Sequence, residues 1–196
     1  MERRDQILDV AARLFAERGF HGVSVGDIGK AVGVSGPALY KHFDSKDAVL
    51  AEMLVAISER LLAEGQERVA QAGGAAEALA ALVDWHVEFA LAQPSLIVVQ
   101  DRDWQSLPAQ ARERVRSLQR EYVDLWAAQL RRRDPDLAVD EARAMAHAAF
   151  GLINSTPHSS RLPPDAMHAL LREMALRSLG LSSLDLSSLD LGPLDA

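Results

Sequence analysis

Apolar side chains along this chain recur at the three- and four-residue spacing of helices, and no strand-like alternation stands out. Ile7, Ala11, Leu14 and Phe15 give a first helix one apolar face, and Gly19 ends it. Glycine and proline breaks then divide the rest of the chain into helical segments. These are expected at about 46–71, 76–92, 95–105, 108–132, 140–156 and 164–179. The pattern predicts an all-α fold.

Two short helices are expected between the first helix and the long segment that starts near residue 46. Ser24 is suited to cap the first of them, with Asp27 three residues on, and Gly33 can end it in a left-handed turn. Ser35 follows after only two or three residues as the next cap, and Pro37 falls in the first turn of the second helix, which we expect to reach Phe43. Helices joined this tightly must cross steeply, as in a helix-turn-helix.

The second short helix has the side chains expected of a helix that reads DNA. Leu39 and Phe43 point inward, so their neighbours face solvent or a partner. Small residues at its start permit close approach to base edges, and its basic groups can donate to bases or phosphates. The expected DNA-binding residues are Ser24, Ser35, Gly36, Pro37, Ala38, Tyr40, Lys41, His42 and Lys46. The alternative is a solvated helix-turn-helix within an unrelated all-α domain.

The segment from Asp27 to Ser35, the tyrosine and histidine before Phe43, and Lys46 resemble the TetR family of bacterial one-component regulators, of the AcrR-like type. The resemblance covers roughly residues 5 to 52, the part that this family shares. Gly29 stands where the family usually has alanine, and it weakens a short helix by up to about 1 kcal/mol.

The resemblance also implies how the chain is organised. A three-helix DNA-binding domain is followed by a helical domain for ligand binding and dimerisation. After Gly180 the repeat Leu-Ser-Ser-Leu-Asp has no helical or strand period, so the residues themselves predict a flexible or loosely docked tail. The expected limits are 1–50, 51–180 and 181–196. In the family, the last two helices of each chain form the interface of a homodimer. Here those helices present Ala142, Met145, Ala149, Leu152, Ile153, Met167, Leu170, Leu171 and Met174. Two-fold symmetry would place two reading helices about 34 to 36 Å apart on a palindromic operator of double-stranded DNA.

The net charge of −7 is unevenly distributed. Residues 1–50 hold seven basic and seven acidic side chains, so the remainder carries the whole negative charge. All three lysines, Lys30, Lys41 and Lys46, lie before residue 50, where they could displace counterions from DNA phosphates. Because residues 1–50 are neutral overall and the remainder is acidic, electrostatics favour an orientation in which residues 1–50 face DNA.

Aromatic residues between 76 and 160 are those expected of a chamber for a small hydrophobic molecule. Trp85 and Phe89, and likewise Tyr122 and Trp126, are spaced i and i+4 on two helices. Polar side chains such as His86 interrupt these apolar helices and could orient a ligand. The expected ligand-binding residues are Trp85, Phe89, Trp104, Tyr122, Trp126 and Asn154. The alternative is that the aromatic stripes are core packing, with Asn154 satisfying a helix end broken by Pro157.

Other classes of protein find little support in the sequence. Without cysteine there is neither a disulfide nor thiolate chemistry, and the six histidines lack the spacing of a metal site. No nucleophile elbow or phosphate-binding glycine loop is present, so neither an enzyme nor a cofactor is expected. No apolar run approaches the roughly 18 to 20 residues of a membrane span, and the amino terminus lacks a signal-peptide pattern, which favours the cytoplasm.

The sequence thus predicts a dimeric transcriptional repressor whose operator affinity falls when an apolar or acyl-type effector binds. A looser likeness of Leu107-Pro108, Arg120-Glu121-Tyr122 and the 154–158 stretch to family members that control fatty-acid or sterol breakdown makes acyl-CoA the first candidate effector. Three alternatives remain: an activator on the same scaffold, a different hydrophobic ligand such as a drug or flavonoid, and a ligand-carrying or enzymatic bundle without a DNA target.

Overall fold

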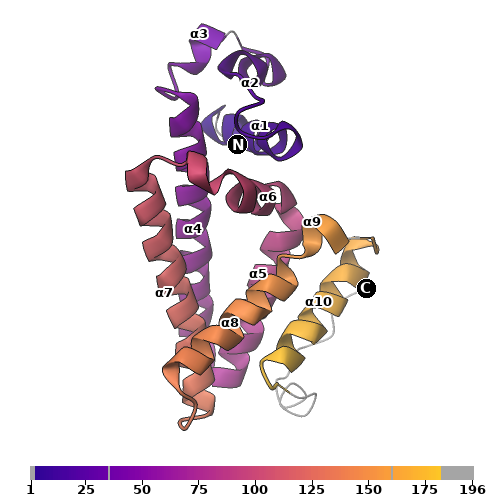
Figure 1. Cartoon of the computed structure of the whole chain (residues 1–196). Coiled ribbons are helices and arrows are strands. Elements are labelled where there is room, and N and C mark those ends of the chain that lie inside the picture. The colour runs from indigo at the N-terminus through magenta and orange to yellow at the C-terminus, as the bar shows by residue number, and fades with distance from the viewer. Residues whose placement is uncertain (1–2, 35, 160, 182–196) are drawn as a thin grey trace. The chain divides into compact units, whose positions relative to one another are not determined.

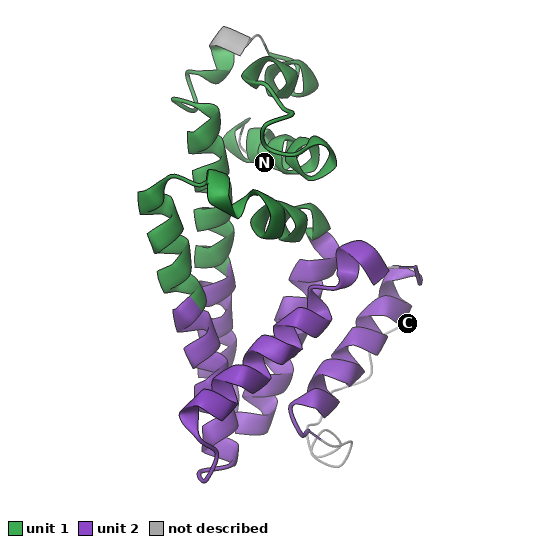
Figure 2. Ribbon diagram, in the orientation of Figure 1, with its two compact units in different colours: residues 1–60, 93–119 green, residues 61–92, 120–196 purple. Residues whose placement is uncertain are grey.

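The computed structural model describes residues 3–34, 36–159 and 161–181, and for residues 36 and 37 the main chain alone (Figure 1). These described residues form ten α-helices and one 3-10 helix and contain no strand, which confirms the all-α prediction. They divide into two compact units, residues 1–60 with 93–119 and residues 61–92 with 120–196 (Figure 2). Helices α4 (Lys46–Gln71) and α7 (Ala109–Arg133) each contribute residues to both units.

The first unit is built on α1 (Arg3–Arg18), which supplies Ile7, Ala11 and Phe15 to the core. Against it pack α2 (Val25–Ala31) and α6 (Pro94–Asp103), and α6 leads into the 3-10 helix η1 (Trp104–Ser106). The first unit is therefore not limited to the amino-terminal segment. The expected functional division near residue 50 stays a prediction.

Of the expected caps of the helix-turn-helix, Ser24 with Asp27 and Gly33 are present, whereas Ser35 lies outside the described residues. Ser24 and Asp27 form a reciprocal capping box, in which each side chain bonds to the main-chain N–H of the other. Gly33 has φ +73°, the left-handed conformation expected after the helix. At the start of α4 the Ser45 hydroxyl accepts from the N–H of Ala48 at 3.0 Å. These short-range contacts fix the entry and exit of the helices.

The second short helix is shorter than expected. Helix α3 covers only Gly36–Leu39, and the chain continues to Phe43 as turns. The main-chain N–H groups of Lys41 and His42 donate to carbonyls three residues back, so the chain tightens and leaves the α-helical path. Leu39 and Phe43 are nevertheless buried, as their spacing predicts.

The second unit is centred on α5 (Ala75–Ala92), whose side chains are buried over most of its circumference. Helices α8 (Val139–Ile153) and α10 (Pro164–Ser178) pack against α5, and the Arg172 guanidinium donates to the Asp84 carboxylate at 2.6 Å. The apolar character of α5 explains its place: a helix apolar on all sides is stable only when covered. The repeat tail from residue 182 onward lies outside the described residues.

Helix α8 ends three residues earlier than the expected 156. Asn154 follows as its C-cap, and a separate short helix, α9 (Thr156–Ser159), begins two residues later. Pro157 lies in the first turn of α9, where its missing N–H costs nothing. The Thr156 hydroxyl donates to the carbonyl of Ala90 at 3.1 Å and anchors this corner to α5. The proline therefore starts a new helix here.

Within the described ranges, no single helix is long and apolar enough to cross a membrane. The segments Ala75–Ala92 and Pro94–Ser106 reach the length and apolar composition of a membrane span only when taken together, and the chain bends between them.

Candidate DNA-binding surface and effector site

The residues expected to contact DNA fall into two groups in the structure. Tyr40 is 54% exposed and Lys41 is exposed on the turn after α3, while Ala38 and His42 are half-buried. The Ser24 hydroxyl is occupied by Asp27, because it donates to that carboxylate at 2.6 Å and accepts from its N–H. These bonds hold the pKa of Asp27 below its usual range. Ser35 lies outside the described residues, as do the side chains of Gly36 and Pro37.

Arg4 on α1 holds the turn that carries Tyr40 and Lys41. Its guanidinium pairs with the Glu52 carboxylate on α4, donates to the main-chain oxygen of His42 and lies 4.3 Å from the ring centroid of Phe43. One side chain thus connects three segments of the helix-turn-helix. A positioned turn can present Tyr40 and Lys41 to a partner with little further loss of entropy.

Lys46 has an internal role that the sequence did not indicate. Its ammonium donates to the main-chain oxygens of Phe20 at 2.7 Å and Val23 at 2.8 Å, and it lies 4.2 Å from the ring centroid of Phe20. An ammonium has three donors, so one is left for another acceptor. Lys46 therefore ties the start of α4 to the loop between α1 and α2.

Arg102 on α6 holds the other end of α1. Its guanidinium donates to the main-chain oxygens of Phe15 and Ala16, the latter at 3.0 Å, and pairs with the buried carboxylate of Asp103 at 3.2 Å. Nearby, the Ser106 hydroxyl lies 3.2 Å from a ring nitrogen of His21. The Phe15 oxygen also accepts from the N–H of Gly19 at 2.8 Å, and carbonyls in the last turn of a helix have few other local donors, so Arg102 adds to the cap of α1 from a distant part of the sequence.

An aromatic and polar cluster lies inside the second unit, and His86 is its centre. The His86 ring stacks on Tyr122 and on Phe150, with centroids 5.8 and 4.8 Å apart, and meets Phe89 and Trp126 edge to face. Its Nε2 lies 3.2 Å from the side-chain oxygen of Asn154, and its Nδ1 lies 3.4 Å from the Tyr122 hydroxyl. We refer to these six residues as the His86 cluster.

Burial controls the protonation of this cluster. It lowers the pKa of His86 to about 4, and it raises the pKa of Tyr122. Both groups are therefore neutral near pH 7. The indole Nε1 of Trp126 is buried and makes no full hydrogen bond, and its interaction with the Tyr122 hydroxyl offsets only part of the rise in the pKa of Tyr122. A buried donor that is not fully satisfied is costly, so it is suited to a carbonyl oxygen that enters the cluster.

The structure brings together four of the six residues expected to bind a ligand: Phe89, Tyr122, Trp126 and Asn154. Trp85 packs elsewhere in the same unit, where its Nε1 donates to the Leu61 oxygen at 3.3 Å and Arg68 covers its ring. Trp104 belongs to the first unit. The ligand-binding role of all six stays a prediction.

Sequence reasoning named His86 only as a polar side chain that could orient a ligand, and the structure places it at the centre of the cluster. It missed Phe150 as a member of the cluster and the cap on α1. The sequence did not mark Arg102 as a cap, because its acceptors are main-chain oxygens 86 and 87 positions away. A backbone acceptor leaves no trace in the sequence.

The last two helices expose part of the apolar face expected at a dimer interface. Leu170 and Met174, one turn apart on α10, are 40% and 46% exposed. On α8 the exposed small residues are Ala144, Ala148 and Gly151. Met145 and Leu152 are half-buried. The other expected residues are buried within the chain itself: Ala142, Ala149, Ile153, Met167 and Leu171.

A helix-turn-helix followed by a larger helical domain is typical of one-component transcriptional regulators. The family model "Bacterial regulatory proteins, tetR family" matches residues 7–53, and "Tetracyclin repressor-like, C-terminal domain" matches residues 72–178. The chain belongs to the TetR family of bacterial transcriptional regulators.

Known relatives agree with this assignment. The HTH-type transcriptional repressor KstR2 of Rhodococcus jostii is 36% identical over 125 residues, which cover 63% of this chain and 61% of that relative. A TetR-family regulator from Bordetella parapertussis is 27% identical, with a TM-score of 0.81 over 94% of this chain and 98% of its own. FadR from Bacillus subtilis, solved in complex with stearoyl-CoA, is 19% identical, with a TM-score of 0.70 over 89% and 97%. This last likeness shows the fold alone.

Proposed function

We propose that this regulator is a dimeric repressor that binds a palindromic operator and releases it when an acyl-type effector enters the His86 cluster. Repression is the activity named for the Rhodococcus relative, of which the chain spans less than two thirds. Tyr40 and Lys41, exposed on a turn that Arg4 holds in place within a helix-turn-helix, are the observation that carries the proposal.

Tyr40 and Lys41 offer a hydroxyl and an ammonium to the DNA backbone or to base edges. Lys46 adds its one remaining donor, so it can contact a phosphate while it holds Phe20 and Val23. Small side chains before them, such as Ala38, leave room for a base pair. Residues 1–50 are neutral overall while the remainder carries the negative charge, so the part of the chain that faces DNA repels it least.

The dimer would form through the exposed face of α8 and α10. Leu170 and Met174 supply apolar surface, and Ala144, Ala148 and Gly151 allow a second helix to approach closely. A Cβ added at Gly151 would meet no atom within 4 Å, so this part of α8 is open. Two copies related by a two-fold axis would present two reading helices to a palindrome.

The effector would enter the His86 cluster, because its lining is aromatic with few polar groups. The rings are in contact, so an acyl chain fits only when they separate. A thioester oxygen could accept from Trp126 Nε1, which makes no full hydrogen bond in the closed cluster. The ligand then favours an open state over the closed one, and this difference in affinity drives the change. Long-chain acyl-CoA is the first candidate, and a neighbour of the same fold holds stearoyl-CoA.

A gel-shift and footprinting experiment tests the proposal, with a palindromic fragment from upstream of the chain's own gene and a scrambled fragment of equal length as control. We expect protection of both half-sites by two copies of the chain. Lys41→Ala should weaken this binding, because it removes an exposed cation from the reading turn. Equal binding of both fragments would refute operator recognition.

A further inference from the structure

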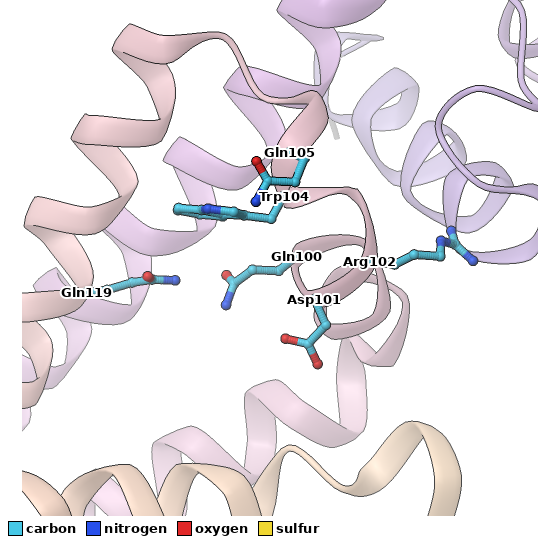
Figure 3. Close-up of a pocket in the computed structure, with 6 residues that line it drawn as sticks. All are labelled: Gln100, Asp101, Arg102, Trp104, Gln105 and Gln119. Atoms are coloured by element: carbon cyan, nitrogen blue, oxygen red, sulfur yellow. The ribbon is translucent and has the colours of Figure 1, made fainter.

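A pocket lies wholly within the first unit, where α6, η1 and α7 meet. It is open to solvent, with a volume of about 340 Å³. Its lining differs from that of the His86 cluster, since most of it is polar. The lining residues are Gln100, Asp101, Arg102, Trp104, Gln105 and Gln119 (Figure 3).

The side chains around this pocket surround the flat indole ring of Trp104. Figure 3 shows the indole of Trp104 facing the opening, with the amides of Gln100 and Gln119 directed toward the same space and Asp101 at its edge. Arg102 points away, consistent with its bonds to the main-chain oxygens of Phe15 and Ala16. The space therefore has one aromatic face, carboxamides and one carboxylate.

These groups select the chemistry of an occupant. An indole face favours a flat aromatic ring, and stacking of bases on aromatic side chains is a common mode of binding. Each glutamine amide offers one acceptor and two donors. A purely apolar ligand would leave these amides unpaired, which lowers affinity. The occupant must therefore be planar and carry both donors and acceptors on its edge.

Adenine meets these conditions better than other bases. A glutamine amide can pair with its N6 amino group and N7 together, whereas guanine is preferentially read by Arg or Lys at O6 and N7. The only arginine of the lining, Arg102, is engaged elsewhere. Asp101 can accept from the amino group of adenine. The guanidinium of Arg116 lies 5.6 Å from the Trp104 ring centroid and offers a nearby positive charge for a phosphate, and its ion pair with Glu113 is long, at 3.9 Å, and exposed.

We propose that this pocket, which we call the base pocket, binds the adenine ring of an adenine nucleotide. The nucleotide can be free or can be the nucleotide end of a coenzyme A thioester. The second source rests on the proposed function, and the first does not. An occupant would contact Asp101 and Trp104, which flank the Arg102 and Asp103 pair that caps α1, so binding could bias the DNA-binding helices directly.

Calorimetric titration of the full chain with AMP, coenzyme A and palmitoyl-pantetheine, which lacks the nucleotide, tests the base pocket. Trp104→Ala should weaken nucleotide binding by about 5- to 150-fold, the usual worth of one stacked base. Trp104→Phe should keep most of the affinity, because it keeps an aromatic face. Gln119→Ala should weaken binding without removing a large side chain. Gln110→Ala, an exposed glutamine on the same helix outside the lining, is the matched control.

The three probes separate the sources. Binding of AMP that depends on Trp104 and Gln119 would assign the pocket to a free nucleotide, and the same dependence for coenzyme A alone would assign it to the thioester. Absence of binding by both probes, or equal affinity of the wild-type chain and Gln119→Ala, would overturn the base pocket. Palmitoyl-pantetheine reports on the effector site alone, so its release of operator DNA would leave the proposed function standing even then.

Discussion

The Nε2 atom of His86 lies 3.2 Å from the side-chain oxygen of Asn154, which comes 68 positions later in the chain. An amide oxygen only accepts, so this contact places the proton of a neutral imidazole on Nε2 and leaves Nδ1 to accept from the Tyr122 hydroxyl at 3.4 Å. His86 therefore links α5, α7 and the end of α8, and it does so as a neutral imidazole with its proton on Nε2.

Acid should destabilise the chain through His86. Its pKa is about 4 in the folded chain against 6.5 for a histidine in an unfolded chain, so between these values the unfolded chain binds a proton that the folded chain excludes. The free energy of unfolding should fall as pH drops through this window, by about 3 kcal/mol in all. His86→Gln keeps a polar side chain but cannot titrate, so its denaturation midpoint should depend less steeply on pH. Equal slopes for both proteins would show that His86 is not excluded from protonation.

Gly65 allows α4 to approach Tyr122 closely. A Cβ at this position would lie 2.9 Å from Cε2 of Tyr122 and 3.2 Å from Leu82 and Leu125. We expect Gly65→Ala to lower the free energy of unfolding, because overpacking of about 1–3 kcal/mol outweighs a gain in helix propensity of up to about 1 kcal/mol. Gly26→Ala, in the ordinary contact distance of 3.5 Å from its nearest neighbour, is the control and should not destabilise. Urea denaturation of both variants measures the difference.

Lys46 should matter for stability as well as for DNA. Lys46→Ala removes the donor to Phe20 and Val23, and we expect a loss of about 1–2 kcal/mol in a partly exposed site. Lys41→Ala, at an exposed position, should change stability by no more than about 0.5 kcal/mol.

In operator binding, each lost phosphate contact should make the slope of log affinity against log salt shallower by about 0.9. A Lys46→Ala protein with wild-type stability would contradict its internal role.

Arg102 should keep the last turn of α1 closed. Arg102→Gln removes the cap on Phe15 and Ala16, so the N–H of Gly19, which donates to the Phe15 oxygen at 2.8 Å, should exchange faster with solvent. Arg13→Gln changes an exposed arginine of the same helix and serves as the control. Hydrogen exchange of the amides of α1 measures the effect. Unchanged protection in Arg102→Gln would mean that α6 does not hold this helix end.

The exposed pair on α10 should carry the dimer. Leu170→Glu with Met174→Lys places opposite charges one turn apart, which favours the isolated helix but opposes burial against a second copy. Light scattering should then show folded monomers that no longer bind the palindrome. Leu162→Glu changes a leucine of similar exposure before α10 and should leave the dimer intact. A dimer that survives both charges would place the interface elsewhere.

Local chemistry made much of the fold predictable. The capping box of Ser24 and Asp27 and the left-handed Gly33 follow from residue types a few positions apart, and both are present. The length of α3 and the role of Lys46 depend on bonds to main-chain groups, which every residue carries, so the sequence did not mark them. Of the aromatic residues, the i and i+4 pair Tyr122 and Trp126 is brought together as expected, whereas Trp104 belongs to the other unit because helix spacing does not specify tertiary neighbours.

Operator affinity measured with and without palmitoyl-CoA tests the central claim most directly. Fluorescence anisotropy of a labelled palindrome, at fixed salt and saturating effector, gives both affinities for the same protein. A coupling of about 1–3 kcal/mol, typical of allosteric proteins, predicts that palmitoyl-CoA weakens operator binding by about 5- to 150-fold. Linkage requires the operator to weaken palmitoyl-CoA binding by the same factor. Tight binding of palmitoyl-CoA with no change in operator affinity would contradict the account. A ligand that binds the operator-bound and the operator-free protein with equal affinity does not shift the equilibrium between them.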